Sequence, residues 1–362
     1  MARIVAAMSG GVDSSVAAAL LARDAAASGD EVIGVWMRLH ADGGEGYEQS
    51  RSCCSPDAAD DARRVAQIVG IPFFALNLER EFGAKVIDAF ADGYLDGSTP
   101  NPCQACNQYI KFDVLLRRGL AAYGAERVAT GHYARVERRD GAFQLLRAAD
   151  GDKDQTYFLW VLGQEQLAAT RFPLGELTKP EVRRMAAELE LPTADKPESQ
   201  EICFVPAGDY RELLAERRGY VGEPGPIVDA AGEQIGTHTG YAHYTVGQRH
   251  GLGVAVGEPV FVQEVRPASN TVVVGRRDEI AARSFAVEGR RFVAGEPPAD
   301  RFAASVRIRH RGAEVPCEVT VVGEERLLVE TSEPVWAPAP GQAAVLYDGE
   351  ECLGGGRIAR AR

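Results

Sequence analysis

A turn near the N-terminus, rich in glycine and serine, has the residue types that hold a phosphate group. Ser9-Gly10-Gly11-Val12-Asp13-Ser14-Ser15 stands between an expected strand (residues 4–8) and an expected helix (residues 14–27). Glycines let the chain turn tightly and bring backbone N–H groups close to an anion. The following helix adds free N–H donors and the positive end of its dipole, and Asp13 could hold Mg²⁺ against the phosphates. The stretch predicts a phosphate-binding loop.

The loop differs from two common nucleotide motifs. It lacks the Gly-Lys-Ser/Thr ending of a Walker A motif and the spacing of the dinucleotide fingerprint. Its Ser-Gly-Gly-x-Asp-Ser pattern resembles the pyrophosphate loop of ATP pyrophosphatases. That resemblance implies cleavage of ATP to AMP and pyrophosphate, with the adenylate transferred to a substrate oxygen. The alternative is a plain turn capped by Asp13, but two glycines and three hydroxyls exceed what capping needs.

Three cysteines are the candidates for sulfur chemistry. Cys103 and Cys106 have C-x-x-C spacing, and Cys106 is expected at the start of a helix (residues 105–123), where the dipole would stabilise a thiolate. Cys203 follows on a polar loop almost 100 residues later. A zinc site would need a second C-x-x-C or paired histidines, whereas three cysteines could bind an iron–sulfur cluster. The other four are expected to pack in the protein: Cys53, Cys54, Cys317 and Cys352.

The elements around these residues predict an α/β domain followed by two β-rich parts. Up to about residue 200, expected strands at 4–8, 31–37, 73–78 and 127–130 alternate with expected helices at 14–27, 56–69, 81–94 and 105–123. This order is typical of an open, mostly parallel sheet covered by helices on both faces. Later short strands predict a small β-rich central module and a C-terminal antiparallel β-barrel. The expected domains are residues 1–210, 211–276 and 277–362.

Composition limits the class of protein. The 362 residues allow two to three domains, and the formal net charge of −12 argues against non-specific nucleic-acid binding over the whole surface. Any RNA would therefore bind on a local patch. No apolar run approaches the roughly 18 residues of a membrane span. Seven cysteines and an N-terminal strand without a signal peptide predict a cytoplasmic protein with reduced thiols.

Several motifs in a fixed order carry a resemblance to a family. The phosphate loop, the Asn-Pro-Cys-x-x-Cys-Asn box and the Glu-Ser-Gln-Glu-Ile-Cys-Phe box are joined by matching stretches at residues 129–135, 152–158, 244–249, 341–343 and 347–349. Over essentially its full length, the chain resembles the tRNA-specific 2-thiouridylase family. The resemblance implies an N-terminal domain of the adenine nucleotide alpha hydrolase type. It also implies an ATP-dependent sulfurtransferase that adenylates the C2 oxygen of the wobble uridine in the tRNA anticodon arm. A persulfide sulfur then replaces that oxygen, giving 2-thiouridine, AMP and pyrophosphate.

The resemblance assigns roles to individual residues. Cys106 matches the nucleophile and Cys203 the cysteine that carries the persulfide, and sulfur transfer can leave a disulfide between them. Positions that match ATP contacts are Ala7, Met8, Ser9, Gly10, Gly11, Val12, Asp13, Ser14, Met37 and Gly131. Positions that match tRNA contacts are Asn101, Pro102 and Cys103 at the target base, then His132, Lys153, Asp154, Gln155, Arg309, His310 and Gln342. Some members have Asp in place of Cys103, which argues against an essential thiol there.

Three alternatives remain open from the sequence. The first is an iron–sulfur cluster on Cys103, Cys106 and Cys203. The second is another ATP-dependent ligase with a pyrophosphate loop, acting on a free nucleobase or an amino acid. The third is a non-catalytic nucleotide-sensing or RNA-binding protein. The main hypothesis implies ATP and Mg²⁺, tRNA, and a sulfur donor that is either a cysteine desulfurase or a persulfide relay protein. Alternating Arg307, Arg309 and Arg311 could also be one solvated face of a strand.

Overall fold

A five-stranded parallel sheet forms the centre of the N-terminal part. The computed structural model describes residues 1–40, 55–198, 202–205 and 209–360. The strand order is β3-β2-β1-β4-β7, and every neighbouring pair is parallel. The bounds are β1 Arg3–Ala7, β2 Glu31–Arg38, β3 Phe73–Asn77, β4 Arg127–Ala129 and β7 Thr170–Arg171. Strands β1 and β2 are buried along most of their length, which explains their nearly continuous apolar sequences.

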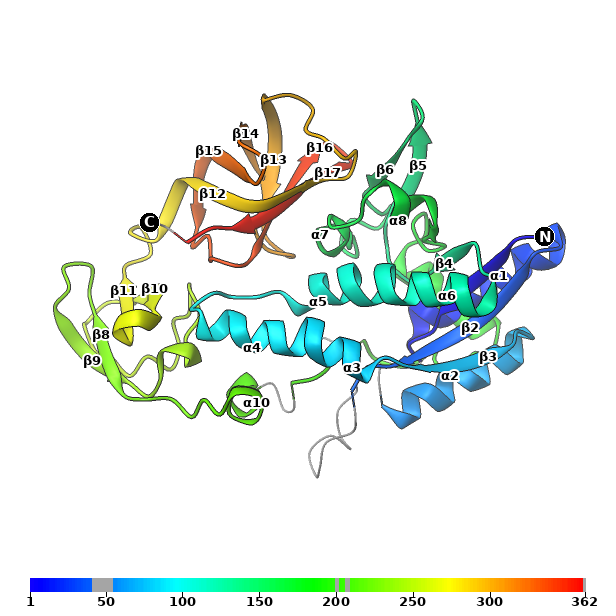
Figure 1. Ribbon diagram of the computed structural model, residues 1–362, viewed down its shortest axis with the longest axis horizontal. Coiled ribbons are helices and arrows are strands. Elements are labelled where there is room, and N and C mark those ends of the chain that lie inside the picture. The colour runs from blue at the N-terminus through cyan, green and yellow to red at the C-terminus, as the bar shows by residue number, and fades with distance from the viewer. Residues whose placement is uncertain (41–54, 199–201, 206–208, 361–362) are drawn as a thin grey trace.

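Helices cover both faces of this sheet, as the sequence predicts. One face packs against α1 (Val12–Ser28), α2 (Pro56–Val69) and α9 (Lys179–Glu188). The other face carries a connected run of helices: α3 Glu79–Phe82, η2 Gly83–Ile87, α4 Asp88–Leu95, η3 Cys106–Leu115 and α6 Leu116–Tyr123. Helix α10 (Tyr210–Arg218) also packs on this side. The alternating pattern of the sequence is therefore confirmed as an open α/β sheet (Figure 1).

The helix that carries the cysteine pair starts earlier than expected. Asn101 is its N-cap and accepts a hydrogen bond from the Gln104 backbone N–H (3.4 Å), and α5 (Pro102–Ala105) forms the first turn. Proline is pre-organised for this first helical position. Cys106 therefore lies beyond the first turn, and the expectation that it stands at the helix N-terminus is wrong. The helix continues from Cys106 as a π-helical stretch, η3, and such stretches are frequent at functional sites.

The β-rich parts follow the sheet along the chain. The central module has the strand order β10-β11-β8-β9, with the 3-10 helices η5 (Tyr241–His243) and η6 (Pro267–Ser269) in its connections. Its strands are β8 Gly225–Val228, β9 Gln234–His238, β10 Phe261–Arg266 and β11 Thr271–Gly275. In the C-terminal part, pairing of β12 with both β15 and β17 closes a six-stranded antiparallel barrel, as expected. Its strands are β12 Ala281–Phe292, β13 Arg301–Arg307, β14 Val315–Val322, β15 Arg326–Trp336, β16 Ala343–Asp348 and β17 Glu351–Ile358.

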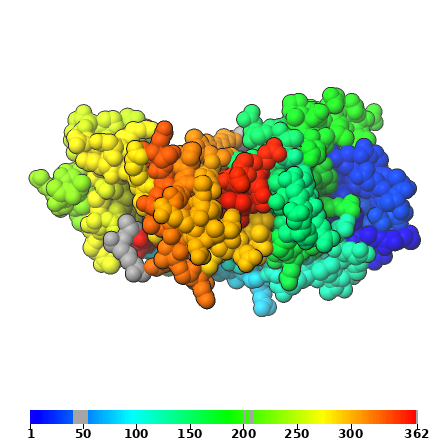
Figure 2. Space-filling model, turned by 90° about the horizontal axis from the view of Figure 1, so that it is seen from above, coloured from blue at the N-terminus to red at the C-terminus, as the bar shows by residue number. Residues whose placement is uncertain are grey.

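A hairpin that the sequence analysis did not expect joins the barrel to the N-terminal part. Strands β5 (Arg135–Arg139) and β6 (Ala142–Leu146) pair with each other, and β6 pairs with β17. Figure 2 shows the C-terminal strand beside this hairpin on one continuous surface. Two short helices, α7 (Thr156–Leu159) and α8 (Gln164–Ala168), complete the junction. Among the described helices, none is long and apolar enough to cross a membrane.

Candidate functional site

The glycine-rich loop joins β1 to the N-terminus of α1. Gly10 has φ +69°, and a Cβ there would lie 2.2 Å from the Ala58 carbonyl oxygen, so glycine is required. Gly11 is the N-cap of α1 without a side-chain cap, which leaves the first N–H groups of the helix for an anion. The Ser14 hydroxyl donates to the Gly11 carbonyl (3.0 Å) and accepts from the Ser9 N–H (3.1 Å). These bonds hold the loop in shape before any ligand binds.

Gly131, which follows β4, lies directly against the start of α1. A Cβ at this position would come within 2.7 Å of the Ser14 backbone nitrogen and 2.8 Å of the Asp13 carbonyl carbon. Both of these neighbours are backbone atoms of the phosphate loop, which cannot rotate away as a side chain can. The ends of β1 and β4 therefore meet at one site, as expected for neighbouring parallel strands.

The Gly131→Ala substitution is expected to lower ATP turnover by at least about tenfold, because the new methyl group must displace the start of α1 and misplace the phosphates. The measurement is steady-state pyrophosphate release, with ATP affinity determined separately. Gly151→Ala is the matched control, since a Cβ at Gly151 meets nothing within 4 Å. Parent-like ATP affinity and turnover in Gly131→Ala would contradict the close approach of Gly131 to the loop.

A charge network extends from the loop to the cysteine box. The Lys179 ammonium donates to both oxygens of Asp13 (2.7 and 2.8 Å) and lies 2.7 Å from Glu198 Oε1. Glu198 also accepts from Lys153 (2.8 and 3.0 Å), and the Tyr133 hydroxyl donates to Asp13 (2.8 Å). The network thus joins the phosphate loop, the start of α9 and the segment that leads to Cys203.

The environment fixes the protonation of this network. Burial alone would raise the pKa of Glu198, but hydrogen bonds from Lys153 and Lys179 lower that pKa to about 2. Burial and the nearby Asp13 charge raise the pKa of Tyr133, so its phenol keeps its proton and remains a donor. A second lysine, Lys196, donates to the Gly10 carbonyl (2.9 Å) and pairs with Asp61 (2.7 Å). Two ammonium groups therefore flank the phosphate loop.

The two proposed sulfur-handling cysteines lie on the same side of the sheet. Cys106 and Cys203 are half-buried and pack against one apolar cluster that includes Phe82 and Val5. His40, which follows β2 and is 9% exposed, makes a hydrogen bond between its Nε2 and the Cys203 carbonyl oxygen (3.1 Å). Met37 lies near the end of β2 in the same cluster. Elements far apart in sequence therefore bring both thiols to one face of the sheet, with Cys203 beside the residue that follows β2.

The remaining cysteines differ from this pair. Cys103 is exposed, one turn before Cys106. Within the described ranges, no three His, Cys, Asp or Glu side chains are arranged to hold a metal ion, so Cys103, Cys106 and Cys203 do not fit an iron–sulfur cluster. Cys317 and Cys352 are buried, as expected for packing residues, and burial raises the pKa of both thiols, that of Cys317 to about 12. Cys53 and Cys54 lie outside the described residues.

The residues assigned to tRNA surround the junction of α7 with the barrel. Phe158 packs on the His310 ring (centroids 4.5 Å apart) and accepts a hydrogen bond at its carbonyl from Asn107 (3.1 Å). Gln342 donates to the Thr99 carbonyl (2.8 Å), beside the Asn101–Cys103 segment. Burial, followed by the charge of Lys111, lowers the pKa of His132 well below its usual range. His132 is therefore neutral, between Thr130 Oγ1 (2.7 Å) and Lys111 Nζ (3.3 Å).

Other residues of this group have structural partners. The Asp154 side chain is 1% exposed and accepts from the Thr156 hydroxyl and from Arg307. Gln155 accepts from the Tyr133 N–H (2.9 Å), while Lys153 is held by Glu198. An RNA contact through the Asp154 carboxylate would have to break its hydrogen bonds to Thr156 and Arg307. We therefore expect RNA contacts at this position to use the main chain.

The arginine run 307–311 does not form one solvated strand face. Strand β13 ends at Arg307, whose side chain is 13% exposed and pairs with Asp154 and Glu314. Arg309 lies over the Trp336 ring (4.6 Å to the centroid) and donates to the Ala337 carbonyl (3.0 Å). Trp336 itself packs on Phe261 of the central module. Arg309 is thus rigidly held where the barrel meets the central module.

Sequence reasoning missed Lys179, Lys196 and His40 as site residues. Lys179 lies in the first turn of α9, where Thr178 and Glu181 form a capping box. The sequence does contain a sign of this role. A lysine in the first turn of a helix is unusual, because a cation is disfavoured at the positive end of the helix dipole. Lys179 is nevertheless 7% exposed, so another interaction must hold it there. That interaction is the pair of carboxylates Asp13 and Glu198.

The fold and the loop define an ATP-binding protein with a HUP domain. A family model described as a tRNA methyl transferase HUP domain matches residues 2–207. A tRNA methyl transferase PRC-barrel domain matches residues 212–276, and an aminomethyltransferase beta-barrel domain matches residues 282–358.

Curated relatives give the particular family. The tRNA-specific 2-thiouridylase MnmA of Chloroflexus aggregans is 49% identical over 99% of this chain and 99% of that protein. The same-named proteins of Carboxydothermus hydrogenoformans (48%, 98% of this chain and 97% of that protein) and Geobacter metallireducens (49%, 98% and 96%) match similarly. The chain belongs to the tRNA-specific 2-thiouridylase family.

Proposed function

We propose that this protein transfers sulfur to C2 of the wobble uridine of tRNA by way of an adenylated intermediate and a persulfide on Cys203. Family membership supports the ATP-dependent tRNA sulfurtransferase activity. The observation that supports this mechanism is that Cys106 and Cys203, almost 100 residues apart in the chain, pack against the same apolar cluster. Two other hypotheses, a different pyrophosphate-loop ligase and a non-catalytic sensor, leave the second cysteine without a role.

The first step activates the carbonyl. The uridine C2 oxygen is a poor leaving group, and its attack on the α-phosphate of ATP converts it into an adenylate while pyrophosphate leaves. The N–H groups of the loop and α1 bind the phosphates, and Lys179 and Lys196 offset the charge on pyrophosphate. Asp13 fits Mg²⁺, which one carboxylate and substrate phosphates commonly bind. When bound, Mg²⁺ would neutralise charge on those phosphates.

The second step delivers sulfur. The terminal sulfur of the Cys203 persulfide attacks C2, or Cys106 first attacks the persulfide and releases sulfide. In the direct route AMP leaves with the former C2 oxygen, and the Cys106 thiolate then attacks Cys203 Sγ, which breaks the S–S bond and leaves the sulfur on C2. In the other route the released sulfide attacks C2 and AMP leaves. Both routes end with a Cys106–Cys203 disulfide that a thiol reductant must reduce. The uridine must leave its base stack to reach the site. The sulfur donor is a persulfide-bearing protein, and we propose a cytoplasmic location.

The direct test incubates the protein with unmodified tRNA, ATP and a persulfide source, and then measures 2-thiouridine by mass spectrometry of the nucleosides. We expect 2-thiouridine only when all components are present. Pyrophosphate release that needs no tRNA, without a thiolated base, would instead favour a small-molecule ligase. ATP binding without any turnover would favour a non-catalytic sensor.

We propose that residues 1–210 carry the chemistry, with residues 211–276 and 277–362 binding the anticodon arm. Asn101, Pro102 and Cys103 would meet the target base, and His132, Lys153, Gln155, His310 and Gln342 would position the RNA. Arg309 is the clearest test among these residues, because Lys153→Ala would also free Glu198. Adenosine would contact Met37 and Gly131, with the phosphates over the Ala7–Ser14 loop.

The Arg309→Ala substitution is expected to weaken tRNA binding at least several-fold. It should also reduce the slope of the logarithm of the binding constant against the logarithm of salt concentration by about one. ATP affinity should not change, because Arg309 contacts Trp336 and Ala337 rather than the loop. The measurement is a tRNA binding titration at several salt concentrations. Arg301→Ala is the control, because Arg301 is an exposed arginine of the same barrel that pairs with Glu318. Equal salt slopes for both variants and the parent would remove Arg309 from the RNA surface.

A further inference from the structure

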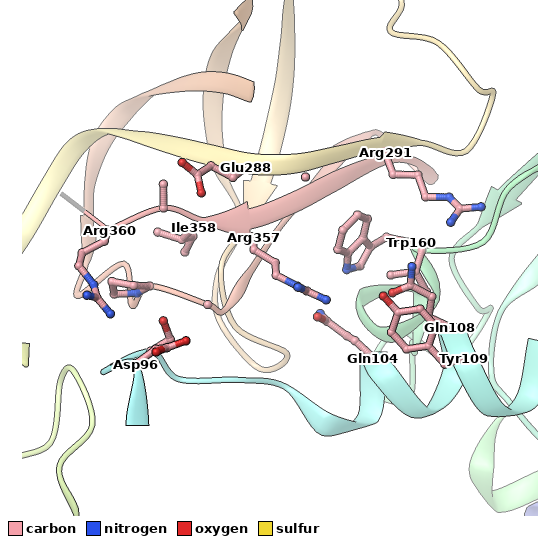
Figure 3. A pocket seen from close by; sticks show the side chains of 16 residues that line it. Asp96, Gln104, Gln108, Tyr109, Trp160, Glu288, Arg291, Arg357, Ile358 and Arg360 are labelled. Carbon is pink, nitrogen blue, oxygen red and sulfur yellow. The ribbon is translucent and has the colours of Figure 1, made fainter. Parts of the chain in front are cut away.

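A polar cavity lies between the α5–η3 helix and the C-terminal barrel. Its volume is about 600 Å³, within the range of small-molecule sites. The walls come from α5 and η3, from Trp160 and Val161 directly after α7, and from β12 and β17 of the barrel (Figure 3). None of the residues assigned above to ATP, sulfur transfer or tRNA lines it. The cavity therefore shares none of those residues, although Gln104 and Gly341 on its wall adjoin Cys103 and Gln342 in the chain.

Three arginines make this cavity a site for an anion. Arg291, Arg357 and Arg360 line it, and within the described ranges none of them has a salt bridge to a carboxylate. Arg291 makes only a long hydrogen bond to Gln166 (3.4 Å). Of the two acidic residues on the wall, Glu288 is already paired with Arg326 (2.6 Å), and Asp96 lies at the end of the cavity where Arg360 is, away from Arg291 (Figure 3). In a chain of net charge −12, such a concentration of arginines is unexpected without a ligand.

A buried donor points into the same space. Trp160 is 4% exposed, and its indole N–H is buried without an acceptor among the described atoms. Figure 3 shows its nitrogen facing the guanidinium of Arg357 and the amide of Gln104. Arg357 can only donate, the Gln104 amide nitrogen already donates to the Tyr157 carbonyl (3.3 Å), and the Trp160 N–H makes no hydrogen bond with the described residues. A buried N–H without an acceptor is destabilising, and a ligand oxygen between Trp160 and Arg357 would supply the missing hydrogen bond.

The other walls suit a nucleotide rather than a bare anion. Tyr109 supplies an aromatic ring, and Gln108 beside it supplies an amide that can both donate and accept hydrogen bonds. Aromatic rings stack on bases of any sequence. Arginine is the preferred partner of phosphate because its planar fork donates two parallel hydrogen bonds. The donors thus match a phosphate, and the remaining wall matches a base and ribose.

We propose that this cavity binds a phosphate-bearing nucleotide, with the phosphate between Arg291, Arg357 and the Trp160 N–H. Two sources carry this chemistry: a free mononucleotide or a nucleotide of a bound RNA strand. The proposal does not depend on thiolation chemistry, because its readout is binding. It assigns Trp160 as a ligand-contacting residue and Tyr109 as the surface on which the base stacks.

The test uses the full-length protein with its phosphate loop saturated by a non-hydrolysable ATP analogue. AMP and an unmodified tRNA transcript are titrated separately into the parent, the Arg291→Gln/Arg357→Gln double variant, and Trp160→Phe. Arg301→Gln is the control, and the thermal midpoint of unfolding is measured for each variant. We expect the double variant and Trp160→Phe to bind at least one of the two probes about tenfold more weakly, with Arg301→Gln unchanged.

The probe whose binding is weakened identifies where the bound nucleotide comes from. Weaker binding of AMP alone would indicate a free mononucleotide, whereas weaker binding of tRNA would indicate a nucleotide of the RNA. The proposal is overturned if folded double-variant protein binds both AMP and tRNA as tightly as the parent. It is also overturned if Arg301→Gln weakens binding equally, since the effect would then come from net charge and not from the cavity.

Discussion

The Cys203→Ser variant is expected to accept no persulfide from a sulfur donor, whereas Cys106→Ser still accepts one, and neither produces 2-thiouridine. Serine is nearly isosteric with cysteine but does not ionise at neutral pH, so each change removes thiolate chemistry with little change in packing. Both cysteines are half-buried against the same cluster, so the two substitutions should disturb the packing to a similar extent. A difference between the variants would therefore report their chemical roles.

The measurement is intact-protein mass after exposure to the donor, followed by nucleoside analysis of the tRNA. A persulfide adds one sulfur, about 32 Da. ATP affinity should match the parent in both variants, because backbone N–H groups and lysines of the loop region bind the phosphates. Cys103→Ser is the matched control: its side chain is exposed, and it should keep at least about half of the parent activity.

Three outcomes would oppose the assigned roles. A persulfide on Cys203→Ser would place the sulfur elsewhere, and 2-thiouridine formation by Cys106→Ser would remove Cys106 from the reaction. Loss of activity in Cys103→Ser, together with iron in the purified protein, would favour an iron–sulfur cluster over the persulfide as the sulfur-handling group. The geometry of the three cysteines in the described residues disfavours that last result.

The sequence predicted the features whose determinants are contiguous. The strand, loop and helix around Gly10 follow from local patterns, and α2 has the expected bounds because Ser55, Pro56 and Gly70 mark its ends. The barrel was also expected from short strands with regular turns. The β5–β6 hairpin was missed because its partner, β17, lies at the other end of the chain. The early start of α5 was missed although Asn101 and Pro102 are standard start signals.

The same reason explains the missed site residues. Lys179 meets Asp13 across 166 residues, and His40 meets Cys203 across 163 residues. No local pattern relates such pairs, because the strand order and the loop geometry bring them together. Spacing likewise suggested one solvated face for Arg307, Arg309 and Arg311, whereas the end of β13 at Arg307 and the contact with Trp336 separate them.

We propose that Lys179 binds the phosphates of ATP, although its ammonium pairs with carboxylates in this structure. In the absence of ATP, its ammonium is shared between Asp13 and Glu198, and the two carboxylates are balanced by Lys179 and Lys153. We expect bound ATP to change this balance, because its phosphates would supply new anionic partners and Mg²⁺ on Asp13 would compete with Lys179 for that carboxylate. Lys179 can then turn from Asp13 to the phosphates while it keeps its bond to Glu198.

The Lys179→Met substitution is expected to lower pyrophosphate release by about a hundredfold, because it removes a charge that stabilises the leaving group. The loss should appear mainly in kcat, since backbone N–H groups still bind ATP. Methionine keeps the apolar stem and avoids a buried unpaired amine. Lys85→Met is the matched control, because the Lys85 side chain is 41% exposed and contacts Asp113 outside the site.

Glu198→Gln separates the phosphate role of Lys179 from its link to the RNA side. The amide keeps the size of Glu198 but weakens the bridge between Lys153 and Lys179, whose hydrogen bonds hold the Glu198 pKa near 2. Because this carboxyl stays ionised from neutral pH down to about pH 2, a pH change between 6 and 8 cannot mimic the substitution. We expect Glu198→Gln to bind ATP normally but to lose most of the stimulation of pyrophosphate release by tRNA.

If Lys179→Met released pyrophosphate as fast as Lys85→Met, Lys179 would only neutralise Asp13 in the ligand-free protein.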